Sequence, residues 1–211
     1  ALSVVGEDQT VGAVRLVDPA GMEGKEIALC GYVLGAGADG QMLFAAADPK
    51  APAAPIKRQD LGERGHVLVT DSAGKVQADL GSLKALGSYL VFSPTGKYLA
   101  HRTQDKDGPF IEVLSTDGKE KLVVRYPAFP LAVTDEALVV TKGPTAGRGE
   151  QAVISSAEGR RRKLAENLVA AAVSGGRLWH VQRIQRGETP VIRSLKLPTA
   201  AELAAEPEPA P

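Results

Sequence analysis

Paired β-hairpins recur about every 40 residues along this chain, and this repeat limits its fold more than any other feature. Residues 92–100 read Phe-Ser-Pro-Thr-Gly-Lys-Tyr-Leu-Ala, which predicts a strand, a tight turn and a second strand. Units of the same kind lie at residues 37–44, 92–100, 133–140 and 173–181. Gly96 and Gly176 are 80 residues apart, and Glu136 lies halfway between them. The step between these copies is therefore 40 residues.

A second hairpin alternates with the first. Its turns lie at residues 71–74, 116–119 and 157–160, and residues 13–30 form an N-terminal copy. Gly74 and Gly118 are 44 residues apart, and Gly118 and Gly159 are 41 residues apart. Asp-Gly and related pairs favour such turns because glycine adopts positive φ without steric cost. The runs between the turns are short and rich in β-branched residues, which is typical of strands.

Two hairpins per repeat make a four-stranded unit, the size of one β-propeller blade. We therefore predict an all-β fold, a small β-propeller of about four four-stranded blades over residues 1–197. An Ala/Glu/Pro-rich tail follows at residues 198–211, with one helical turn expected at 200–205. Two forms of the propeller stay open, because exposed strand edges must be covered. The ring is closed by the N- and C-terminal strands, or it is incomplete and a partner covers its edge.

Charge and composition exclude several classes of protein. The 25 basic and 25 acidic residues balance, which argues against a nucleic-acid-binding surface. No apolar run approaches the roughly 20 residues that span a bilayer. The single cysteine, Cys30, lies in an apolar run and is predicted to be a buried thiol. Because the chain begins at Ala1, as after removal of a signal peptide, we expect a periplasmic or extracellular location, with the cytoplasm as the alternative.

The segment 92–100, followed by Ile-Glu-Val at 111–113 and Thr-Asp-Gly at 116–118, resembles the WD40-like repeat of the TolB type. That family's pattern is Phe-Ser-Pro-Asp-Gly-Lys, a strand, a polar loop, a second strand and a short turn with glycine. Thr95 stands here where Asp is usual. The resemblance implies a propeller used for protein contacts, often exported in bacteria, and it implies no active site.

Two basic segments are candidate partner-binding sites. Residues 47–65 contain three prolines and are predicted to form an irregular surface loop that carries Lys57 and Arg58. A dense basic run follows later in the chain, at Arg160, Arg161, Arg162 and Lys163. It is interpreted either as a solvated strand edge, where charge discourages pairing, or as a patch for an acidic partner.

His101 and His180 occupy equivalent positions in two repeats. They are candidate channel-lining residues that would serve a ligand or cation, with chance polar positions on half-exposed strands as the alternative. Trp179, on the same predicted strand as His180, is interpreted as a core residue, with a contact anchor at an interface as the alternative.

Two short motifs are better explained as turns. Residues 35–40 match Gly-x-Gly-x-x-Gly, but a strand follows where a dinucleotide site needs a helix, so a hairpin is predicted. Residues 105–108 with Glu112 offer too few oxygen ligands in sequence for an EF-type calcium loop, and they predict a polar turn. Neither Gly-x-Ser-x-Gly nor His-Glu-x-x-His occurs in the sequence.

The leading functional hypothesis is a non-catalytic scaffold for protein–protein interaction, or a subunit of a larger assembly. Its loops at 47–65 and 143–149 would meet a protein partner, and the tail at 198–211 would dock on that partner. The alternative is a ligand- or cation-binding sensor or accessory module of an enzyme system. We predict no catalytic residue, metal ligand, cofactor, nucleic-acid partner or transmembrane segment.

Overall fold

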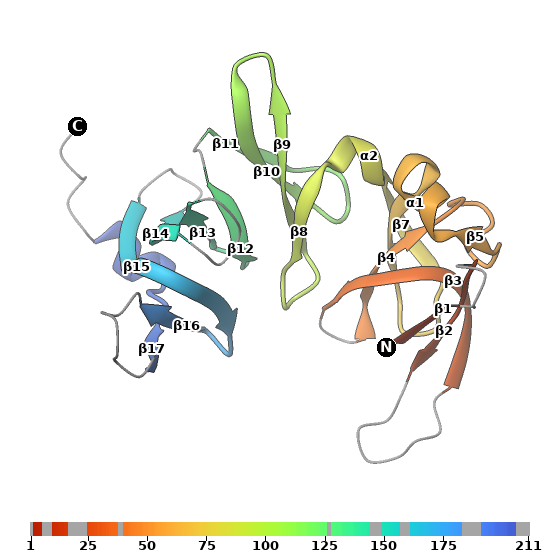
Figure 1. Cartoon of the computed structure of the whole chain (residues 1–211), viewed down its shortest axis with the longest axis horizontal. Coiled ribbons are helices and arrows are strands. Elements are labelled where there is room, and N and C mark those ends of the chain that lie inside the picture. Colours follow the sequence, from red (N-terminus) through yellow and green to blue (C-terminus); the bar gives the residue numbers. More distant parts are fainter. Residues whose placement is uncertain are drawn as a thin grey trace. The chain divides into compact units, whose positions relative to one another are not determined.

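The structure, a computed structural model, describes residues 2–5, 10–16, 25–37, 40–125, 128–143, 149–156, 161–182 and 191–205. Most of these residues are in antiparallel strands (Figure 1). The chain divides into two compact units. Unit 1 comprises Ala1–Gly87, Pro94–Lys97 and Ser115–Glu120, and unit 2 comprises Ser88–Ser93, Tyr98–Leu114 and Lys121–Pro211.

Unit 1 contains one sheet and two short helices. Its strands are β1 (Leu2–Val5), β2 (Thr10–Leu16), β3 (Lys25–Ala36), β4 (Met42–Ala46), β5 (Ile56–Lys57), β6 (His66–Thr70) and β7 (Val76–Ser82). The helices are α1 (Arg58–Arg64) and α2 (Leu83–Leu86). The strand order is β1-β2-β3-β4-β6-β7, and β5 pairs with β2.

The long strand β3 changes partner at Gly31. Its first half pairs with β2 as far as Cys30, and its second half pairs with β4 from Gly31 onward. Gly31 has a φ of +154°, and a Cβ there would lie 1.9 Å from the carbonyl oxygen of Ala45. Glycine is therefore required where β3 leaves one neighbour and approaches the next.

Strand β4 is buried on both faces. Met42, Phe44 and Ala46 pack into one apolar cluster of unit 1, whereas Ala45 belongs to another. This burial explains a continuous apolar run in place of polar–apolar alternation. Cys30 is also buried, as predicted, and burial, followed by the nearby charge of Glu26, raises the pKa of its thiol.

The prediction of an irregular loop at residues 47–65 was wrong, because β5 and α1 lie within it. Ile56 and Leu61 are buried together with Ala45, so apolar burial anchors both elements on the sheet. The Cys30 N–H also donates a 2.7 Å hydrogen bond to the carbonyl oxygen of Pro52. The three prolines suggested irregular backbone, whereas the two buried side chains decided the local structure.

Unit 2 contains two sheets and a C-terminal helix. The first sheet consists of β8 (Ser88–Phe92), β9 (Tyr98–Asp105), β10 (Gly108–Ser115) and β11 (Lys121–Val124), in sequential order. The second consists, also in sequential order, of β12 (Phe129–Val133), β13 (Ala137–Lys142), β14 (Gly149–Ser156), β15 (Arg161–Ser174), β16 (Arg177–Gln182) and β17 (Ile192–Lys196). The helix is α3 (Ala200–Ala204).

Strand β15 repeats the partner change of β3. It pairs with β14 up to Leu168 and with β16 from Leu168 to Ser174. Asn167, next to this junction, has a φ of +55°. Asparagine is one of the few residues with a side chain that enters this region readily, so the strand turns between neighbours without a glycine.

The predicted hairpins form, but they assemble differently from the four-blade prediction. The first kind is observed as β3–β4, β8–β9, β12–β13 and β15–β16. The second is observed as β2–β3, β6–β7, β10–β11 and β14–β15. Because β3 and β15 each belong to two hairpins, the strands join into sheets of seven, four and six. Consecutive runs of four strands are β3–β4–β6–β7, β8–β11 and β12–β15, whereas the last run, β15–β16–β17, has three.

The resemblance motif closes the turn between β8 and β9. The Ser93 N–H donates to the carbonyl oxygen of Tyr98 at 2.8 Å, and the Tyr98 N–H donates to Ser93 Oγ at 3.0 Å. Gly96 has a φ of +76°, and its carbonyl oxygen accepts a 2.9 Å hydrogen bond from the Thr116 hydroxyl. The serine and glycine of this motif are therefore explained by backbone hydrogen bonding and by positive φ.

The start of the C-terminal tail packs against the apolar core of unit 2, to which it belongs. Thr199 and Glu202 form a capping box at α3, and the buried Leu203 joins the apolar cluster that contains Leu178 and Leu197. The Ala200 N–H also lies 3.2 Å from a carboxylate oxygen of Glu136, to which it donates. The predicted helical turn at 200–205 is confirmed. Residues 206–211 lie outside the described part of the chain, and docking of the tail on a partner stays a prediction.

Aspartates of three β-turns have lowered pKa values. For Asp117, the cause is first a side-chain hydrogen bond from Lys119, and then the Ser115 hydroxyl, which donates at 2.6 Å. For Asp71, the first cause is a hydrogen bond from the Lys75 N–H. The pKa of Asp105 is lowered first by a hydrogen bond from Arg125, whose Nη2 lies 2.7 Å from the Asp105 carboxylate.

The lowered pKa of Asp117 predicts a defined loss of stability in acid. Its carboxylate stabilises the fold above its unfolded pKa of about 4, and this contribution disappears as the pH falls through the lower folded pKa. Asp117→Asn is therefore expected to lower the Tm at neutral pH, by a difference that shrinks below about pH 4. Circular dichroism melts at pH 7 and pH 2.5 measure it, with the exposed Glu63→Gln on α1 as the control. A difference that is equal at both pH values contradicts the prediction.

Candidate functional site

The basic candidates of the sequence lie at two separate places. Lys57 and Arg58 are exposed where β5 meets α1 in unit 1. Arg161, Arg162 and Lys163 begin β15 in unit 2, and their side chains are exposed, whereas Arg160 lies outside the described residues. Among the described strands, this half of β15 pairs only with β14. That placement fits the interpretation of a charged, solvated strand edge.

His101 is buried in a chain of polar contacts. Its side chain is 1% exposed, and its Nε2 lies 3.2 Å from Glu112 Oε2. The other carboxylate oxygen of Glu112 lies 2.6 Å from Lys121 Nζ, and Lys121 reaches solvent. The carboxylate therefore joins a buried imidazole on β9 to a surface ammonium group on β11.

His180 is buried on a different sheet, on β16. Burial, followed by the positive charge of Arg193, lowers its pKa and favours the neutral imidazole. Phe44 and Val140 stand at the corresponding positions of the other two repeats, and both are buried. The repeat thus uses this position for packing in every copy, and a channel-lining role for the two histidines stays a prediction.

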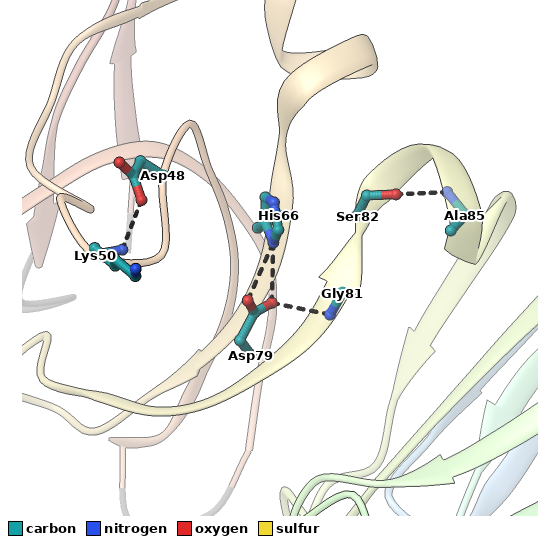
Figure 2. Close-up of polar contacts among 7 residues, drawn as sticks. All are labelled: Asp48, Lys50, His66, Asp79, Gly81, Ser82 and Ala85. Carbon is teal, nitrogen blue, oxygen red and sulfur yellow. Dashed lines mark hydrogen bonds and ion pairs between the residues drawn. The ribbon is translucent and has the colours of Figure 1, made fainter.

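A histidine–aspartate pair that the sequence did not single out lies in unit 1 (Figure 2). His66 Nδ1 lies 3.1 and 3.2 Å from the two carboxylate oxygens of Asp79. The Gly81 N–H donates to the same carboxylate at 2.9 Å. The two residues are 13 positions apart in the sequence. The pairing of β6 with β7 shifts register between His66, which pairs with Ser82, and Leu68, which pairs with Asp79. No sequence signal marks that shift.

The contacts of the His66–Asp79 pair point to a structural role. Ser82 on β7 is the strand-pairing partner of His66 on β6. The Ser82 hydroxyl does not serve the histidine, because its Oγ accepts a 3.1 Å hydrogen bond from the Ala85 N–H and caps α2 (Figure 2). The carboxylate thus fastens a β-bulge to the preceding strand, and the hydroxyl starts the helix. Over the described ranges, no group of three His, Cys, Asp or Glu side chains is placed to hold a metal ion.

The strongest candidate surface is the terminal sheet, which we define as residues 168–174 of β15 together with β16 and β17. Leu178 and His180 of β16 are buried, whereas Trp179 between them is 44% exposed. Ile192 on β17 is 70% exposed and pairs with Val181, on the face that carries Trp179. The prediction that Trp179 is a core residue was therefore wrong, because the register of β16 directs it away from the core.

The terminal sheet is also basic. Arg177, Arg193 and Lys196 are its charged residues, and residues 168–182 and 191–197 contain no Asp or Glu. The Arg177 guanidinium is held by Ser194 Oγ, which accepts at 2.9 and 3.2 Å. An exposed tryptophan and isoleucine beside fixed positive charge form a surface of the kind that binds other proteins.

The fold is similar to that of TolB. The crystal structure of TolB from Acinetobacter baumannii superposes with a TM-score of 0.55 and 16% sequence identity, covering 88% of this chain and 46% of that chain. The uncharacterized protein lmo1340 from Listeria monocytogenes EGD-e superposes with a TM-score of 0.61 and 10% identity, covering 87% of this chain and 56% of that chain. This chain therefore spans about half the length of either protein.

These similarities identify a TolB-like β-propeller fold. At such low identity they show the fold alone. No protein-family model matches the sequence, and a search of curated proteins found no match. Within the described part of the chain, no helix has the length and hydropathy needed to cross a membrane.

Proposed function

We propose that this chain is a non-catalytic, exported protein-interaction scaffold, and that its terminal sheet is the binding surface. The observation that carries this proposal is the exposed Trp179 on β16, with the more exposed Ile192 on the neighbouring strand. Tryptophan dominates the binding energy of many protein interfaces, because it buries a large area with little loss of side-chain entropy. The TolB-like fold supports the proposal, since the repeat that it resembles is typical of exported propellers that contact proteins.

The proposal predicts that a partner depends on Trp179. Immobilised wild-type protein is compared with Trp179→Ala on extracts of the producing cells, and retained proteins are identified by mass spectrometry. A retained protein is then purified and its Kd is measured with both forms. We expect Trp179→Ala to weaken binding by about tenfold or more, because truncation of a central anchor costs about 2 kcal/mol or more.

The matched control is Val123→Ala, which removes an exposed side chain from β11 of a different sheet. Its Kd is expected to stay within about twofold of the wild-type value. A scaffold role for the terminal sheet is refuted if no purified protein distinguishes wild type from Trp179→Ala. It is equally refuted if Val123→Ala weakens binding as much as Trp179→Ala.

A further inference from the structure

The terminal sheet is one strand short of a four-stranded run. Three consecutive runs contain four antiparallel strands each, whereas β15, β16 and β17 make three, as do β1, β2 and β3 at the other end of the described chain. Among the described residues, β17 pairs with β16 on one side and has no strand on the other. The outer N–H and C=O groups of Ile192–Lys196 are thus positioned to pair with a further strand.

The edge at β17 differs from the charged edge at the start of β15. There, Arg161, Arg162 and Lys163 follow one another, and such charge density discourages strand pairing. Strand β17 instead begins with Ile192, which has the largest exposed fraction, 70%, among the described large hydrophobic residues. Val191, directly before it, is 58% exposed. The outer edge of β17 is therefore apolar at its start, and its two cations, Arg193 and Lys196, are separated along the strand.

The charges of the terminal sheet select the kind of strand that fits. Arg193 and Lys196 lie on β17 itself, and Arg177 of β16 pairs with Lys196. The terminal sheet carries no acidic residue. A second copy of β17 would bring two further cations to an edge that already carries Arg193 and Lys196, which is unfavourable. Arg193 pairs with His180 and so lies on the face opposite to Ile192 and Trp179. An incoming strand of alternating residues would therefore place acidic side chains beside Arg193 and cover Ile192 and Trp179 with its apolar side chains.

We propose that β17 accepts an extended segment of a partner protein as an added fourth strand, and that this segment alternates acidic and apolar residues. The inference deepens the proposed function and rests on it, because it names the mode of binding and the partner chemistry of the same surface. Backbone hydrogen bonds would supply much of the affinity, and alternate side chains would supply the specificity.

Synthetic peptides test this mode of binding directly. Trp179 is the single tryptophan of the chain, so its fluorescence reports binding at the terminal sheet. The probe is an acetylated heptapeptide of alternating glutamate and valine, and a lysine–valine peptide of the same length is the charge control. We expect saturable binding of the acidic peptide, weakening as salt is raised, and binding of the basic peptide that is weaker by about tenfold or more.

Backbone methylation separates strand addition from simple docking. In an extended peptide, alternate N–H groups point to the same side, so N-methylation of the odd or of the even residues blocks one edge only. We expect one methylated isomer to lose about tenfold or more in affinity, whereas the other stays within about twofold. Equal affinities of the two isomers would overturn strand addition.

Variants of the full chain locate the site. Ile192→Glu replaces an exposed apolar side chain by a negative charge. It is expected to weaken the binding of the acidic peptide by about tenfold or more. Val123→Glu places the same charge on β11 and is expected to have an effect within about twofold, with circular dichroism verifying that both variants fold.

The outcomes of the two sets of experiments are distinguishable. If no peptide binds, although a purified partner depends on Trp179, the strand-addition inference is wrong and the scaffold function stands. If no partner depends on Trp179, the scaffold function itself fails. A concentration-dependent dimer that Ile192→Glu abolishes would show that a second copy occupies this edge, and would overturn the acidic-strand proposal.

Discussion

Replacing Gly31 by alanine is expected to lower the free energy of unfolding by about 3–5 kcal/mol. The added Cβ would lie 1.9 Å from the carbonyl oxygen of Ala45 and 2.9 Å from Phe44 Cζ, and the backbone φ of +154° is unfavourable for alanine. Relief of the clash requires β3 and β4 to separate at their junction. Urea denaturation followed by far-UV circular dichroism measures the change.

Gly62→Ala is the matched control for this prediction. Gly62 lies in α1, and a Cβ there would meet no heavy atom within 4 Å. Alanine favours helix over glycine by up to about 1 kcal/mol, so this variant is expected to be neutral or slightly more stable. Equal destabilisation by the two substitutions would contradict the role assigned to Gly31.

Leu178→Ala is expected to destabilise the protein by about 3 kcal/mol. Leu178 is 0% exposed and belongs to the main apolar cluster of unit 2, so its truncation leaves a cavity. Trp179→Ala, at the next position, removes a larger side chain from the opposite face of β16, where it is 44% exposed. Its cost is expected to be about 1 kcal/mol or less.

The comparison of these two variants tests the register of β16. The midpoints of urea denaturation are compared at equal protein concentration, with wild type as the reference. A slip by one residue would exchange the faces of Leu178 and Trp179, and the tryptophan variant would then be the less stable. Such a reversal would also remove the basis of the proposed binding surface.

The TolB-like fold could be expected from the chain because its evidence is local. The hydrogen bonds between Ser93 and Tyr98 and the positive φ of Gly96 arise within the segment 92–100 itself. The pairing of neighbouring strands follows, since consecutive strands joined by short turns pair antiparallel. The repeat spacing therefore predicted the order of hairpins along both units.

The candidate surface could be predicted only in part. Its basic character is visible in the composition of residues 168–182 and 191–197. The exposure of Trp179 is not, because an isolated aromatic residue on a strand fits either face. The contact of His66 with Asp79 was missed for a related reason, since a β-bulge changes which side chains meet.

The sequence by itself determined the hairpins, their turns and their spacing, since these depend on turn residues and on the apolar pattern of each short run. The tertiary structure alone decided how the hairpins join. Nothing in the sequence around Gly31 or Asn167 marks them as special. Near these residues, however, β3 and β15 each stop pairing with one strand and begin pairing with another. It also decided which face of β16 is covered and that β17 lies at an edge. Those features depend on packing between segments far apart in the chain, which no local pattern records.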